Sequence, residues 1–185
     1  VSPSVNLCIE LLDQENVINL MGNKELEVLG TLEDTQQIEI ITPGGEIPLP
    51  TDYDVTEKNK QFIKRFMMNA SFSHGELSYS FSHGRPISLA CGYNFTVLDE
   101  SSLEKHANEM NAQVNFCGHL HRTQVMILYP DGRSLTREVD KSVSFPLSPE
   151  QICGINLGML SESGFANDLT YAIIHADEAR VELFI

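Results

Sequence analysis

The spacing of apolar residues predicts helices and strands that alternate in the first half of the chain. Apolar positions recur every three to four residues over 3–14 and 56–66, as on one face of an amphipathic helix. The apolar run 16–21 predicts a buried strand, which Gly22 ends. Residues 30–52 have no sustained period, so we expect a long irregular segment able to cover a site.

Strands dominate the prediction for the second half. Short alternating or apolar runs predict strands at 67–72, 77–82, 114–117, 125–129, 134–139, 169–175 and 180–185. One helix is expected at 101–110, where Ser101 and Glu104 form a capping box. This mixture predicts an α/β sheet with antiparallel additions.

Composition limits the classes of partner. The 185 residues, 42% of them hydrophobic, suit one globular domain over 1–185 with a sizeable core. Because 26 acidic residues face 12 basic ones, giving a formal net charge of -14, we expect no stable binding to nucleic acid. A small phosphorylated substrate remains compatible with this charge, since a metal ion can supply local positive charge.

The cysteines and the hydropathy pattern favour a cytoplasmic location. Cys8, Cys91, Cys117 and Cys153 form no CxxC pair and match no zinc-ligand spacing, so we expect reduced thiols, most of them buried. No run of 18 apolar residues occurs, and we therefore expect no transmembrane helix and no membrane partner.

Two histidines follow a predicted strand directly. Gly118 ends the strand 114–117, and His119 and His121 come next, two residues apart. Side chains at i and i+2 of an extended segment project to the same side, so both imidazoles can bind one metal ion or two adjacent ions. Imidazole suits zinc, iron, manganese or nickel. The alternative is a pair of polar loop histidines without a ligand.

Two further strands are followed by similar polar residues. The segment Ser-His-Gly-Arg-Pro begins at Ser82 and presents His83, and the segment Gly-Asn-Lys-Glu begins at Gly22 and presents Asn23 and Lys24. Taken alone, each is better explained as an ordinary surface turn. Together they are more informative, because parallel strands bring their carboxyl ends into one crevice.

The order of these three segments resembles the calcineurin-like metallophosphoesterase superfamily, and within it the small bacterial and archaeal phosphodiesterase branch. The helix at 2–12 resembles the helix after that branch's second motif, and residues 155–158 resemble its closing Asn-Pro-Gly loop. The resemblance implies an α/β fold in which a two-sheet sandwich is flanked by helices (αββα).

The resemblance also implies a site. Asn23, His83 and His119 would bind one metal ion and His121 a second, while Lys24 stands where the family has a histidine near the leaving group. Family members hold two divalent ions (manganese, iron, zinc or nickel), which activate a water molecule that attacks the phosphorus atom.

The tripeptide Ser-His-Gly occurs twice, with its histidine at His74 and at His83. We choose His83 as the ligand because it follows the second strand of the hairpin and precedes Arg85-Pro86, as in the family. We expect His74 to lie in the hairpin turn and to be exposed.

Two family motifs, Asp-x-His and Gly-Asp, do not occur within residues 1–185. We expect them upstream, in an N-terminal strand-helix-strand segment that this sequence lacks. Two dications about 4 Å apart repel by roughly 16 kcal/mol at an effective dielectric constant near 20, and a bridging carboxylate normally offsets this. Because the candidate ligands here are neutral, we expect at most one ion in this chain alone and two in a complete protein.

The predicted function is metal-dependent hydrolysis of a small phosphate ester by a phosphodiesterase or phosphatase. The alternative is a catalytically degenerate fold that serves as a binding or scaffold module. Lys24 in place of the family histidine, and Leu157 in place of the proline of the closing loop, favour this alternative.

Overall fold

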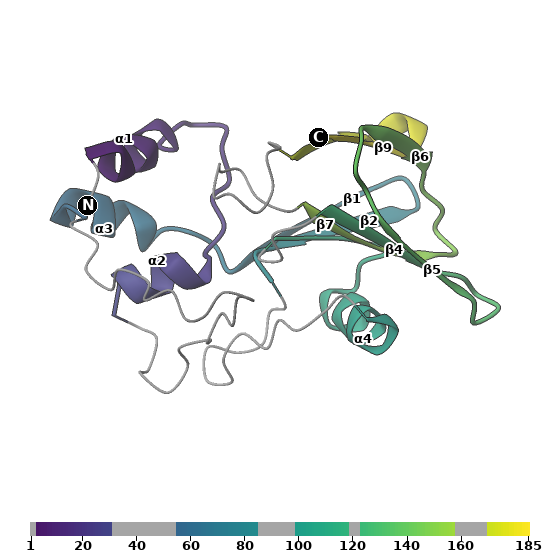
Figure 1. Ribbon diagram of the computed structural model, residues 1–185. Coiled ribbons are helices and arrows are strands. Elements are labelled where there is room, and N and C mark those ends of the chain that lie inside the picture. Colours follow the sequence, from purple (N-terminus) through teal and green to yellow (C-terminus); the bar gives the residue numbers. More distant parts are fainter. Residues whose placement is uncertain (1–2, 31–54, 85–98, 119–122, 158–169) are drawn as a thin grey trace, which may run out of the picture. The chain divides into compact units, whose positions relative to one another are not determined.

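The computed structural model describes residues 3–30, 55–84, 99–118, 123–157 and 170–185 (Figure 1). The chain divides into two compact units, residues 1–68 and 69–185, and we describe each by itself. All but the first residue of the predicted irregular segment 30–52 lies outside the described residues.

The described part of the N-terminal unit is helical. Its helices are α1 (Pro3–Leu11), α2 (Asn23–Val28) and α3 (Glu57–Ile63). The two helices predicted over 3–14 and 56–66 are confirmed with shorter bounds. The predicted strand 16–21 is wrong: only Leu20 forms a β-bridge, which is parallel and joins Met67. An apolar run forms a strand only when it can pair with a neighbouring strand. Among the described residues of this unit, the run 16–21 has one pairing partner, Met67.

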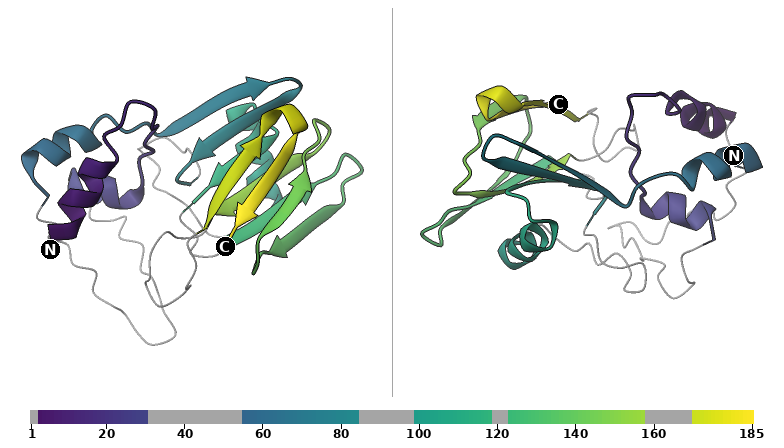
Figure 2. Two further views of the ribbon diagram at one scale, coloured as in Figure 1. Left: turned by 90° about the horizontal axis from the view of Figure 1, so that it is seen from above. Right: turned by 180° about the vertical axis from the view of Figure 1, so that it is seen from behind.

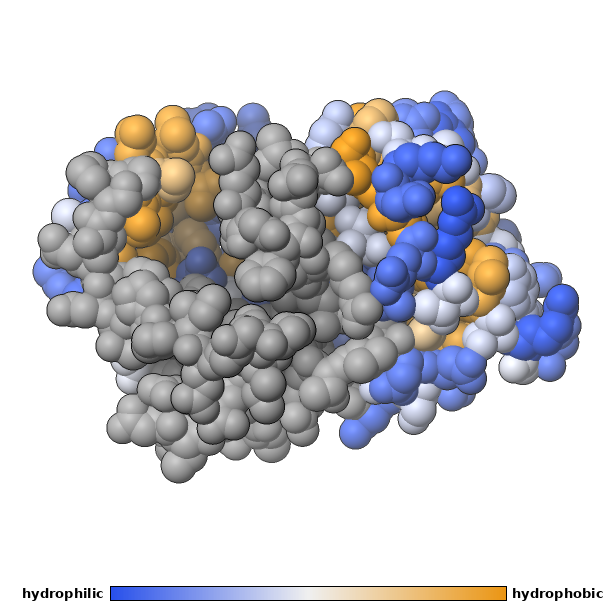
Figure 3. All heavy atoms as spheres, viewed as in Figure 1, coloured by the Kyte–Doolittle hydropathy of each residue, from blue (hydrophilic) through white to orange (hydrophobic). Residues whose placement is uncertain are grey.

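Helix α1 contacts α3 through polar side chains rather than through its leucines. The Asn59 side-chain amide donates to Asn6 Oδ1 at 2.8 Å, and Asn59 is itself buried. Leu7 and Leu11, on the apolar side of α1, are 57% and 61% exposed. Figure 3 shows apolar residues at the surface of this unit, so the amphipathic pattern identified the helix but not the face that packs.

The C-terminal unit contains two β-sheets. The strands are β1 (Asn69–His74), β2 (Leu77–Ser82), β3 (Val114–Cys117), β4 (Thr123–Leu128), β5 (Ser134–Glu138), β6 (Val143–Pro146), β7 (Ile152–Leu157), β8 (Tyr171–His175) and β9 (Arg180–Phe184). A six-stranded sheet has the order β1-β2-β3-β7-β4-β5, and a three-stranded sheet has the order β6-β9-β8. Strands β2, β3 and β7 run parallel, while the other pairings are antiparallel.

The two sheets share one hydrophobic core. Tyr79 and Ile155 of the larger sheet and Val181 and Leu183 of the smaller sheet are all fully buried in the same cluster. Figure 2 shows the smaller sheet over one face of the larger one, with α4 (Glu100–Met110) against the other face. The predicted class, a two-sheet α/β sandwich flanked by helices, is therefore confirmed.

The strand predictions for this unit hold, with two omissions. The hairpins β1–β2, β4–β5 and β8–β9 and the strand β3 all form where they were expected. Strands β6 and β7 were not predicted, and residues 155–157, expected in a loop, belong to β7. Strand β7 lies between β3 and β4 and is buried, so its sequence lacks the alternation that marks a half-exposed strand.

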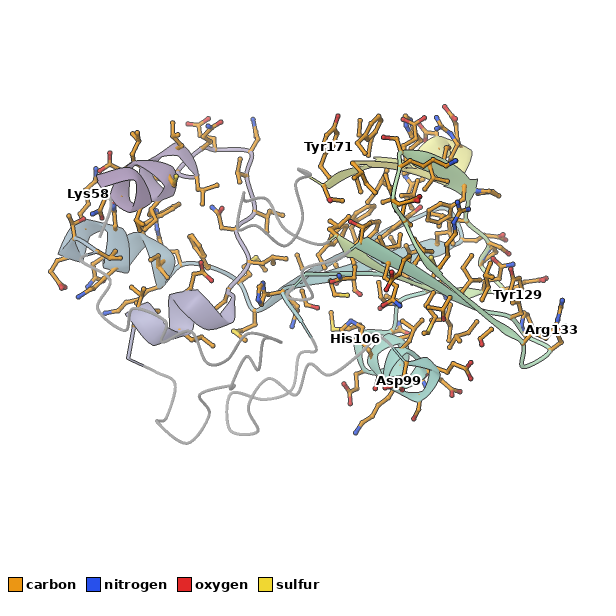
Figure 4. All side chains as sticks on the ribbon, viewed as in Figure 1. Lys58, Asp99, His106, Tyr129, Arg133 and Tyr171 are labelled. Carbon is orange, nitrogen blue, oxygen red and sulfur yellow. The ribbon has the colours of Figure 1, made fainter. Side chains whose placement is uncertain are left out.

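The N-cap of helix α4 lies two residues before the predicted one. Asp99 is the N-cap: one carboxylate oxygen accepts from the backbone N–H of Ser102 at 2.8 Å (Figure 4). Ser101 therefore lies inside the first turn, and the predicted capping box of Ser101 with Glu104 is wrong. Both residues are typical caps, and the carboxylate of Asp99 also complements the positive end of the helix dipole.

Candidate functional site

Three parallel strands of the larger sheet end side by side. Register pairs Ser82 of β2 with Cys117 of β3, and Cys117 with Asn156 of β7. The residues that follow these three positions therefore leave the sheet along one edge. Ligands of open α/β sheets bind beyond the carboxyl ends of parallel strands, which makes this edge the candidate site.

Two of the predicted ligand-bearing segments meet at this edge. The backbone N–H of Gly118 donates to the carbonyl oxygen of His83 at 3.0 Å. A Cβ atom placed on Gly118 would lie 3.6 Å from Nδ1 of His83, so the imidazole lies directly beside this glycine. His83 and the residue that precedes His119 are therefore neighbours, as the parallel register of β2 and β3 requires.

A further hydrogen bond holds the backbone around His83. The Ser82 hydroxyl donates to the carbonyl oxygen of Gly84, so the contact spans the histidine. The Ser82 side chain is buried, which shields this bond from competing water. The end of β2 thus presents His83 from a locally fixed turn.

His74, in the other Ser-His-Gly tripeptide, lies elsewhere. It is the last residue of β1 rather than part of the turn, which Gly75 and Glu76 form with Gly75 at a φ of 59°. The antiparallel register pairs His74 with Leu77 at the start of β2, so it lies at the opposite end of the hairpin from His83. Its Nε2 lies 2.9 Å from Oδ1 of Asp177, and its side chain is 47% exposed.

For His119 and His121, only the neighbouring parts of the chain are described. His119 and His121 lie outside the described residues, but the flanking residues Gly118 and Thr123 are described at the ends of β3 and β4. Thr123 pairs with Leu157 at the end of β7, so both ends of this short connection lie at the candidate edge. The roles of the two histidines stay predictions.

Asn23 and Lys24 are the first two residues of α2 in the N-terminal unit. Their side chains lie outside what the structure describes. The backbone N–H of Gly22, just before them, donates to a carboxylate oxygen of Glu25 at 2.9 Å, so Glu25 belongs to the start of the helix. The predicted roles of Asn23 and Lys24 stay predictions.

Polar residues that sequence reasoning did not select lie behind the candidate edge. The Cys117 thiol donates to Oδ1 of Asn156 at 3.8 Å, and Asn156 is fully buried. Burial raises the pKa of Cys117 to about 12, so this side chain is a neutral thiol rather than a thiolate. The sequence does place a polar residue, Ser82, Cys117 or Asn156, at the end of each of the three strands. This shared feature was not recognised because the strand β7 was not predicted.

The described residues place one of the predicted metal ligands, His83, at this edge. Within the described ranges, no three His, Cys, Asp or Glu side chains are grouped so that they could hold an ion. His83 does stand at the edge, and its ring is next to the glycine that leads to His119. Imidazole and amide ligands suit a divalent transition metal, whereas two close ions need bridging carboxylates.

A comparison with solved structures supports the fold. A crystal structure of a metallophosphoesterase from Sphaerobacter thermophilus matches 96% of this chain and 70% of its own chain, with a TM-score of 0.63 and 17% sequence identity. No protein-family model and no curated protein matches the sequence. At this identity the likeness concerns the fold alone, and the chain has a metallophosphoesterase-like fold.

No helix among the described residues is long and apolar enough to cross a membrane.

Proposed function

We propose that this chain is a metal-dependent phosphoesterase that hydrolyses a small phosphate ester, as a phosphodiesterase or a phosphatase. One observation carries the proposal: the backbone of Gly118 is hydrogen-bonded to His83 at the carboxyl edge of parallel strands. The fold is shared with a protein described as a metallophosphoesterase, which makes phosphoester chemistry the best-supported reaction class.

The proposed roles follow the sequence motifs. Asn23, His83 and His119 hold one divalent ion, and His121 belongs to a second metal position. Such an ion, when bound, supplies Lewis-acid stabilisation of phosphoryl charge and an activated water molecule. The chain's own task at His83 is to keep the imidazole fixed beside Gly118. Lys24 is proposed to interact with negative charge near the leaving group.

The neutral ligands limit metal loading. We propose manganese, iron, zinc or nickel as the ion, and one bound ion for these 185 residues. A second ion would need the carboxylates of the family motifs that are absent from residues 1–185. Because the formal net charge is -14, the chain as a whole does not attract a negatively charged phosphate. Substrate binding should therefore depend on the bound ion.

The repeated tripeptide provides a matched test. His83→Ala and His74→Ala remove the same side chain from the same Ser-His-Gly context at opposite ends of one hairpin. We expect His83→Ala to lower Mn²⁺- or Ni²⁺-dependent hydrolysis of aryl phosphate mono- and diesters by more than about 100-fold, beyond the usual cost of losing a ligand's supporting partner. His74→Ala should leave hydrolysis unchanged. Equal effects of the two substitutions would contradict the proposal.

The second candidate function is a binding or scaffold module on the same fold. Lys24 and Leu157 differ from the family pattern, and Leu157 is part of β7, where it pairs with Thr123. Metal analysis of the purified chain separates the two functions. A folded chain that binds no Mn²⁺ or Ni²⁺ at millimolar concentration and has no hydrolytic activity favours the scaffold.

A further inference from the structure

Two neighbouring rows of side chains cross the larger sheet close to the candidate edge. The register across β2, β3, β7 and β4 defines both rows. The first row is apolar and contributes to the core between the sheets: Phe81, Phe116, Ile155 and Val125. The next row toward the edge, the polar row, points to the opposite face: Ser82, Cys117, Asn156 and Gln124.

Three side chains of the polar row are buried, and the fourth, Cys117, is half-buried. Asn156 is fully buried, and Ser82 and Gln124 are at least nine-tenths buried. Oε1 of Gln124 is buried and has no hydrogen-bond partner among the described residues; a buried unpaired polar atom costs about 1–3 kcal/mol. Apolar residues of similar size would avoid this cost, so the polar row needs another explanation.

The location of the polar row supplies that explanation. Ser82 immediately precedes His83, and Cys117 immediately precedes Gly118, whose N–H bonds to His83. Cys117 is tied in turn to Asn156 on the next strand. A chain of contacts thus runs from the buried amide of Asn156 to the strand end that carries the proposed ligands.

We propose that the Cys117–Asn156 pair of the polar row is a positioning element for the metal site, acting through the ends of β2 and β3. This inference rests on the proposed function. Groups behind metal ligands fix the ligand orientation, and removing one typically weakens metal binding 10–100-fold. Neither residue touches the ion in this role; together they hold the ends of β2 and β3 beside His83 and Gly118.

Two cysteines of the larger sheet, the half-buried Cys117 and the buried Cys153, allow a controlled test. Cys117 and Cys153 lie on neighbouring strands, but Cys153 belongs to the apolar core on the other face. We expect Cys117→Ala to weaken Mn²⁺ binding at least about 10-fold, as followed by the electron paramagnetic resonance signal of free Mn²⁺. Cys117→Ser, which keeps a donor, should restore most of the affinity, and Cys153→Ala should leave it unchanged.

Asn156 and Asn115 form a second matched pair. Both are buried, on adjoining strands and on the same face, but Asn115 lies two residues farther from the edge and bonds to Ser80. Asn156→Ala should weaken Mn²⁺ binding at least about 10-fold. Asn115→Ala should leave Mn²⁺ binding by the folded chain unchanged, whatever stability it loses.

The outcomes separate the two proposals. If the unaltered chain binds no Mn²⁺, the proposed function fails and the positioning role fails with it. If the unaltered chain binds Mn²⁺ and the Cys117 and Cys153 variants bind it equally well, only the positioning role is overturned. Circular dichroism of each metal-free variant establishes that the compared chains are folded.

Discussion

His74 and His83 stand in identical tripeptides, yet the backbone gives them different surroundings. The antiparallel hairpin separates them by its full length, and only His83 meets the end of a parallel strand. His74 instead faces the exposed carboxylate of Asp177. At the scale of the residue, the surroundings of a histidine therefore depend on the strand end at which it lies. The identical local sequence does not reveal this difference.

Tyr79 provides a prediction at the same scale. Its side chain is fully buried in the core, and its Oη has no hydrogen-bond partner within the part of the chain that the structure describes. Burial raises the pKa of the phenol. Tyr79→Phe removes only this unsatisfied hydroxyl. We therefore expect the free energy of unfolding in urea to stay the same or to rise by up to about 3 kcal/mol.

Tyr171→Phe is the control for this prediction, because Tyr171 is half exposed and its ring stacks on Phe184 at 4.7 Å between centroids. Its unfolding free energy should not change. A loss of more than about 1 kcal/mol in Tyr79→Phe would mean that the hydroxyl has a hydrogen-bond partner after all.

Helix α4 carries the prediction at the scale of the element. Asp99 caps its N-terminus through the backbone N–H and the hydroxyl of Ser102, whereas Ser101 lies within the first turn. Asp99→Ala should lower the free energy of unfolding by about 0.5–2 kcal/mol. Ser101→Ala should leave it nearly unchanged or slightly higher, since alanine is the better helix former. Chemical denaturation of the two variants in parallel tests the assignment, and a larger loss for Ser101→Ala would reverse it.

Helix α1 shows what an amphipathic pattern can and cannot establish. Its leucines recur at helical spacing, and the helix forms where predicted. Yet Asn6 makes the contact with α3, while Leu7 and Leu11 are exposed within the structure described. Periodicity specifies a helix because it is a local property, but the partner of each face depends on elements distant in sequence.

The whole molecule yields a prediction about alkaline pH. Cys153 lies in the core shared by the two sheets, and burial raises the pKa of its thiol from 9.0 to about 12. Below pH 9 the thiol is protonated in both the folded and the unfolded chain, so its contribution to stability is fully present. Between pH 9 and about 12 the unfolded chain ionises first, and each pH unit lowers the free energy of unfolding by about 1.4 kcal/mol.

Cys153→Ala isolates this contribution from the other groups that titrate at high pH. The variant should lose overall stability through the vacated volume but show a shallower decline with pH than the unaltered chain. Urea unfolding across this pH range measures both slopes. Identical slopes would show that the thiol is accessible to solvent in the folded chain.

The sequence by itself determined the α/β character, most helices and hairpins, the order of the ligand-bearing segments and their resemblance to metallophosphoesterases. These features depend on residues close together in the chain, where periodicity, turn residues and motif spacing act directly. It failed at the strand 16–21 and at β6 and β7, because a strand depends on a partner that local pattern does not specify. It also failed at the cap of α4, where Asp99 and Ser101 are both typical N-cap residues. Only the tertiary structure decided that β2, β3 and β7 are parallel neighbours in register, which places His83 beside Gly118 and the Cys117–Asn156 pair behind them. Register is a relation between distant segments, set by the packing of whole sheets, and it is the register that turns separate motifs into one candidate site.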